Sequence, residues 1–148
     1  MLAVFVSYVS AIWIKYGIQK SISDSYYALP EQLRFLFTFF CWGFALPAII
    51  VGVEVTPLMF FAGVGIAFVG AAAQIHDNFV AKVHNITAIS GILFSQLAIY
   101  FGYHLLWLNI ISLSLIALIY FFIKKNYIWW IEIVAFTAIS IALGTAVF

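Results

Sequence analysis

Charged side chains are scarce in this sequence. Asp, Glu, Lys and Arg make up 7% of the 148 residues, whereas a soluble domain carries about 25% charged residues. This shortage excludes an ordinary soluble domain, because too few charges are present to cover its surface. No polar stretch is longer than residues 19–35, which we call loop one, so a separate soluble domain is excluded as well.

Cysteine and histidine are also rare, and this limits the available chemistry. The single cysteine, Cys41, cannot form an intramolecular disulfide or a cysteine metal cluster. His76, His84 and one carboxylate would make a two-histidine, one-carboxylate metal set. His104 cannot join that set, because the intervening helix would place it about 30 Å from His84. We therefore expect no metal site and no cofactor.

Hydrophobic residues are abundant, at 67% of the chain, and the mean hydropathy is +1.19. They fall into six apolar segments, at residues 2–18, 33–53, 58–75, 83–101, 106–123 and 127–147. As helices these segments would be about 26 to 32 Å long, enough to cross roughly 30 Å of hydrocarbon. They predict an all-α fold, with one polytopic integral membrane domain over residues 1–148 and six transmembrane helices.

Positive charge predicts the orientation of these helices, because Lys and Arg favour the cytoplasmic side. All six basic residues lie in or beside the first, third and fifth connections: Lys15, Lys20, Arg34, Lys82, Lys124 and Lys125. This segregation puts the three charged loops in the cytoplasm and both termini outside. We expect a multi-pass protein of the inner or plasma membrane.

The few other polar side chains gather near the same predicted face, in loop one, in the third connection and at the start of the sixth helix. We expect them to form a vestibule that binds a lipid head group or a similar small polar ligand, with membrane lipids as partners and no nucleic acid. The candidate ligand-binding residues are Ser21, Ser23, Asp24, Glu31, Gln74, His76, Asp77, His84 and Glu132. Lys20, Arg34 and Lys82 would attract an anionic group.

Two alternatives stay open at this point. Ser23 would be the nucleophile of a lipid hydrolase or acyltransferase, with His84 or His76 as base and Asp24 or Asp77 as orienting group. The same hydroxyl and carboxylate would serve equally well to cap turns in loop one. Glu132 would in the simplest case extend to the membrane interface or pair with Lys82, Lys124 or Lys125.

The second alternative is a small accessory subunit of a membrane complex. Small residues recur on the third apolar segment at Gly63, Ala67 and Ala71, and such faces let another helix approach closely. The fourth segment has a similar face around Gly91. We expect these two faces to pack against each other, unless they bind other membrane proteins.

The loops also resemble those of a known family. Residues 22–24 read ISD, residues 30–31 read PE and position 35 is Phe, while Gln74 is followed by His84 and Ala88 in an H-x-x-x-A pattern. This set is similar to the first and third loops of the FRAG/DRAM/SFK group of six-helix membrane proteins. The resemblance implies lipid-linked work, such as remodelling of glycosylphosphatidylinositol anchors, membrane lipid organisation or autophagy regulation. It implies no catalytic mechanism.

Overall fold

The computed structural model describes residues 1–73 and 78–147, and this part of the chain is helical, with no strand. The prediction of an all-α fold is therefore confirmed. The elements are α1 (Leu2–Tyr16), α2 (Ser25–Ala28), the 3-10 helix η1 (Glu31–Leu33), α3 (Phe35–Val55), α4 (Pro57–Ala72), α5 (Asn78–Leu97), the π-helix η2 (Ala98–Gly102), α6 (Leu106–Phe122) and α7 (Tyr127–Val147). The longer helices coincide with the six apolar segments to within a few residues, and loop one holds α2 and η1.

Three helical stretches within the described residues are long and apolar enough to cross a membrane: Glu31–Val55, Lys82–Gly102 and Tyr127–Ala146. The other apolar helices, α1, α4 and α6, have 15, 16 and 17 residues. A helix of that length reaches about 22 to 26 Å, which is less than the roughly 30 Å of a typical hydrocarbon core.

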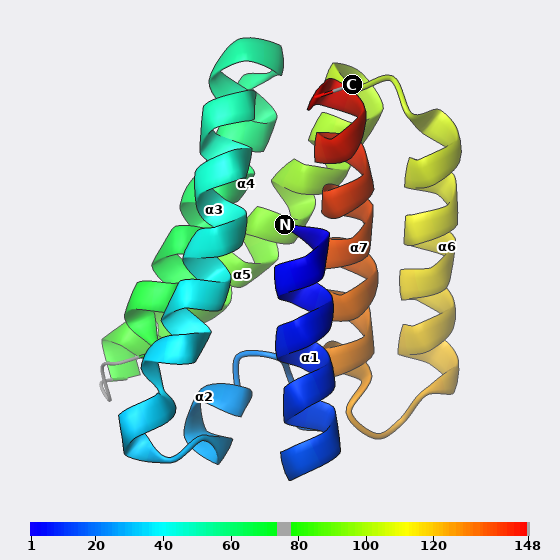
Figure 1. Cartoon of the computed structure of the whole chain (residues 1–148). Helices are drawn as coiled ribbons and strands as arrows, with labels where there is room; N and C mark the ends of the chain where they lie inside the picture. The colour runs from blue at the N-terminus through cyan, green and yellow to red at the C-terminus, as the bar shows by residue number, and fades with distance from the viewer. Residues whose placement is uncertain (74–77, 148) are drawn as a thin grey trace.

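Successive long helices run in opposite directions, so their ends alternate between two ends of the molecule (Figure 1). The end of α1, loop one, the start of α5 and the connection before α7 all lie at one end. These are the segments that carry the six Lys and Arg residues. We call this the basic end.

Helices α3 and α4 form a tight antiparallel pair. Thr56 starts α4 by accepting a hydrogen bond from the Leu58 backbone N–H at 3.3 Å, and Pro57 occupies the first helical position, where its missing N–H costs nothing. The two backbones approach so closely that a Cβ at Gly52 would lie 2.2 Å from the Phe60 nitrogen.

The small residues of α4 face two neighbours. The Gly63 position contacts Ala45 and Ile49 of α3, whereas the Gly65 position contacts Thr87 and Gly91 of α5. The expectation that the Gly63 face packs on α5 was therefore wrong, although α4 and α5 do pack closely. Gly65, two residues further along the helix, supplies that contact.

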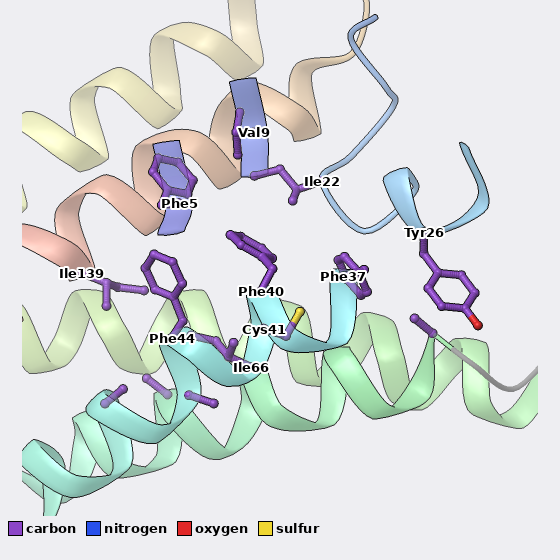
Figure 2. Close-up of a cluster of buried hydrophobic side chains, with 14 of the residues drawn as sticks. Phe5, Val9, Ile22, Tyr26, Phe37, Phe40, Cys41, Phe44, Ile66 and Ile139 are labelled. Carbon is purple, nitrogen blue, oxygen red and sulfur yellow. The ribbon is translucent and has the colours of Figure 1, made fainter. Parts of the chain in front are cut away.

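The core at the centre of the molecule is aromatic. Figure 2 shows Phe40 and Phe44 of α3 directed toward Phe5 of α1. The Phe44 ring centroid lies 4.8 Å from that of Phe136 in α7, and the Phe40 centroid lies 4.6 Å from that of Tyr8. These ring contacts join α1, α3 and α7 around one centre. Helix α6 lies outside this core, beside α7 (Figure 1).

Candidate functional site

Loop one folds against the beginning of α7. The Trp129 backbone N–H donates to the Lys20 carbonyl at 3.1 Å, and the Asn126 side-chain amide donates to the Ile18 carbonyl at 3.0 Å. The Ile22 backbone N–H donates to the Glu132 carboxylate. Because the first N–H groups of a helix have no partner within the helix, the Lys20 carbonyl satisfies a group that α7 would otherwise leave open.

The Ile-Ser-Asp stretch of loop one forms a compact turn. The Ser21 hydroxyl oxygen accepts from the Asp24 backbone N–H at 3.0 Å and lies 3.0 Å from the Ser23 hydroxyl. Ser25 is fully buried, and its hydroxyl contacts the Tyr8 hydroxyl at 2.7 Å. Short hydroxyl side chains are suited to such turns because they replace backbone partners. The turn fixes the position of the Ile22 N–H.

A cavity of about 40 Å³ lies next to this turn, between loop one and the helices α3, α4, α5 and α7. Its lining is mostly apolar and comprises Ile22, Ser23, Phe37, Phe40, Cys41, Ile66, Val69, Thr87, Ala88, Gly91, Ile92, Glu132, Ala135, Phe136 and Ile139. A ligand site is commonly a concave apolar space with a few polar groups. This cavity has that character, with Glu132 as its carboxylate.

Glu132 lies in the second turn of α7, between the loop and the cavity. One carboxylate oxygen accepts from Ile22, and no ion pair with Lys82, Lys124 or Lys125 is formed among the described residues. The three lysines are exposed, whereas Glu132 is partly buried. The predicted pairing of Glu132 with these lysines was therefore wrong. The helix turns Glu132 toward the interior, and the lysines extend outward.

The predicted catalytic candidates are only partly brought together. Asp24 and His84 are both partly buried, and Asp24 is close enough to act electrostatically on both His84 and Glu132. Neither Asp24 nor His84 lines the cavity, whereas Ser23 does. The hydroxyl of Ser23 bonds to that of Ser21, and no histidine within residues 1–73 and 78–147 pairs with it.

The other predicted site residues are placed differently. Ser21 is buried in the loop-one turn, and Glu31 is exposed in η1. Gln74, His76 and Asp77 lie outside the described residues. Among the described residues, no group of three or more His, Cys, Asp and Glu side chains is arranged to hold a metal ion.

Sequence reasoning did not identify the apolar wall of the cavity. Phe37 and Phe40 lie in a segment with little polar marking of its faces, whereas Phe136 lies four residues after Glu132 and so on the same helix face. Gly91 was noted only as a small residue for helix packing. It also lines the cavity, and the sequence carries no signal for that position.

A second polar cluster joins α5 to α6. The Gln96 side-chain oxygen accepts from Ser112 at 2.7 Å and from the Asn109 amide at 3.1 Å, and all three residues are buried. Buried amides and hydroxyls hold transmembrane helices together by hydrogen bonds. Gln96 and Asn109 are amide residues within apolar segments, and this pattern could have predicted the cluster.

The fold and the site thus define a class: an all-helical protein with three described helices able to cross a membrane and a carboxylate beside an internal cavity. Comparison of the chain with protein-family models, with curated proteins and with solved structures finds no match. The resemblance to the FRAG/DRAM/SFK group therefore stays a prediction.

Proposed function

We propose that this protein is a six-span membrane protein that binds a lipid or a similar amphipathic molecule in the cavity beside Glu132. The cavity carries the proposal, because it combines an apolar wall contributed by four helices with a polar side at loop one. An amphipathic molecule has the same two parts. Its apolar part would lie against the phenylalanines and its polar group against Glu132.

Six spans agree with the alternating directions of the helices and with the placement of every Lys and Arg at the basic end (Figure 1). In this orientation the basic end is cytoplasmic and both termini are outside. The shorter helices α1, α4 and α6 cross by local thinning of the bilayer and by the use of flanking residues, at a modest cost.

The basic residues and the acidic group act at different depths. Lys20, Lys124 and Lys125 are exposed at the basic end, where they attract anionic lipid to the surface. Glu132 lines the cavity. The group that enters the cavity is therefore not the anionic group that the lysines attract. This revises the predicted vestibule, in which both kinds of residue met one ligand.

Filling the cavity tests this function. Ala88 lines the cavity on α5, and Ala117 is exposed on α6. We expect Ala88→Leu to reduce the lipid that copurifies with the protein, because the larger side chain occupies the cavity. Ala117→Leu adds the same atoms to an exposed surface and should leave the copurified lipid unchanged.

The measurement is native mass spectrometry of protein extracted in mild detergent. Equal lipid retention by wild type, Ala88→Leu and Ala117→Leu would show that the cavity is not the binding site. The readings as an enzyme using Ser23 and His84, or as an accessory subunit, stay predictions for which the geometry offers no specific support.

A further inference from the structure

We propose that the cavity selects a protonated amine carried on a short apolar body, and that Glu132 is the group that pairs with the ammonium. This inference rests on the proposed function, since it specifies the ligand of the same cavity. It follows from the charges, hydrogen bonds and size of the site.

Among the described residues that line the cavity, Glu132 is the only acid and no residue is basic. Glu132 lines the cavity, and Asp24 acts on it electrostatically from loop one. No lysine, arginine or histidine forms an ion pair with Glu132 within the described part of the chain. A carboxylate at membrane depth is costly without a partner, so a cationic ligand supplies what the protein itself does not.

The hydrogen bonds at the cavity leave an acceptor available. Only one oxygen of Glu132 accepts from Ile22, so the carboxylate has a second oxygen for a ligand. The other polar lining groups have partners already: Thr87 donates to the Val83 carbonyl at 2.8 Å, and Ser23 bonds to Ser21. A ligand that brings hydrogen-bond donors matches this site, and an ammonium group brings three.

The wall and the size of the cavity define the rest of the ligand. Phe37, Phe40 and Phe136 all contribute to the lining, and aromatic rings attract cations as well as apolar groups. A water molecule needs about 10 to 15 Å³ of such space. A cavity of about 40 Å³ thus accommodates an ammonium and the first few methylene groups of a longer chain, and it is too small for a complete phospholipid head group.

Hexylammonium and hexanol test the inference, because they share a chain and differ in charge. Binding of each to purified protein in non-ionic detergent is measured by calorimetry for wild type and Glu132→Gln. We expect hexylammonium to bind wild type at least about tenfold more tightly than Glu132→Gln, as losing a desolvated charge pair commonly costs that much or more. Hexanol should bind both proteins equally.

Two further variants make the test specific. Glu132→Gln keeps a side-chain oxygen for the Ile22 N–H, so its fold is retained, and Glu132→Asp keeps the charge and should keep the preference for the amine. Glu54→Gln removes the same charge from an exposed position at the other end of α3. It should bind hexylammonium as wild type does.

The outcomes separate this inference from the proposed function. If hexylammonium and hexanol bind wild type and Glu132→Gln with the same affinities, and Ala88→Leu abolishes both, the cavity binds ligands but the amine selectivity is overturned. If neither molecule binds wild type, the inference is overturned, and the lipid-retention measurement on Ala88→Leu decides the proposed function by itself.

Discussion

At the scale of single residues, Glu132 has a structural task as well as a place at the cavity. Its carboxylate accepts the Ile22 N–H, and a buried N–H left without an acceptor costs about 1–3 kcal/mol. We therefore expect Glu132→Ala to lower the free energy of unfolding by about that amount. Glu132→Gln keeps an acceptor oxygen and should lose much less.

Unfolding of the two variants in mixed micelles, followed by circular dichroism, measures this difference. Glu54→Ala is the control, because Glu54 is exposed and its replacement should change the stability by less than about 0.5 kcal/mol. An equal loss in Glu132→Ala and Glu132→Gln would mean that the charge, rather than the acceptor oxygen, stabilises loop one.

The sequence indicates that Glu132 is unusual, because it is an acid within an apolar segment, but it does not indicate its partner. Ile22 lies 110 positions earlier in the chain and donates through its backbone N–H. Because every residue except proline has a backbone N–H, the residue type does not identify this donor. The serines of loop one were predicted as possible turn caps, because a short hydroxyl side chain can accept from a nearby backbone N–H. Ser21 does this by accepting from the Asp24 N–H. The role of Ser23 and His84 as a catalytic pair stays a prediction.

At the scale of helices, the close approach of α3 and α4 depends on Gly52. A Cβ at this position would lie 2.2 Å from the Phe60 nitrogen and 2.7 Å from its Cα, and backbone atoms cannot move aside as a flexible side chain can. We expect Gly52→Ala to lower the free energy of unfolding by about 1–3 kcal/mol. Thermal unfolding in detergent measures the change.

Gly144 in α7 provides the matched control. Nothing lies within 4 Å of a Cβ built there, so Gly144→Ala should be neutral or stabilise the helix by up to about 1 kcal/mol. If both substitutions changed stability equally, the spacing of α3 and α4 would not be set by Gly52.

Helix α6 packs on α7 and is also joined to α5 through the polar cluster with Gln96. We expect a double-mutant cycle between Gln96→Ala and Asn109→Ala to give a coupling energy of about 0.6 kcal/mol, and at most about 1.7 kcal/mol. Ser114, which is exposed on the same helix, replaces Asn109 in the control cycle and should show no coupling to Gln96. Zero coupling between Gln96 and Asn109 would contradict the contact.

The positions of the helices could be predicted from hydropathy, because long apolar segments form helices that satisfy their own backbone groups. The helix faces that pack against each other could not be predicted from hydropathy. The segment 58–75 is apolar on all sides, so Gly63 and Gly65 look equivalent in the sequence. They differ only because one faces α3 and the other α5.

At the scale of the whole molecule, the basic end predicts how the protein lies in the membrane. We expect a cysteine at Lys124 to react with a membrane-impermeant maleimide in inverted vesicles but not in intact cells. A cysteine at Glu54 should show the opposite pattern. Both are placed in a Cys41→Ala background, because Cys41 is the only native thiol and is buried. Labelling of both sites from one side would contradict the six-span orientation.

The attachment of loop one to α7 has a consequence for biosynthesis. Its side-chain hydrogen bonds connect positions 108 and 110 residues apart. During translation, loop one is therefore made long before α7, the helix that it binds. Until α7 has been made, the Ile22 N–H lacks its Glu132 acceptor, and the space beside it lacks the wall formed by Ala135 and Ile139. The cavity is therefore completed only when α7 has been made, and a nascent chain stalled before α7 lacks that part of its wall.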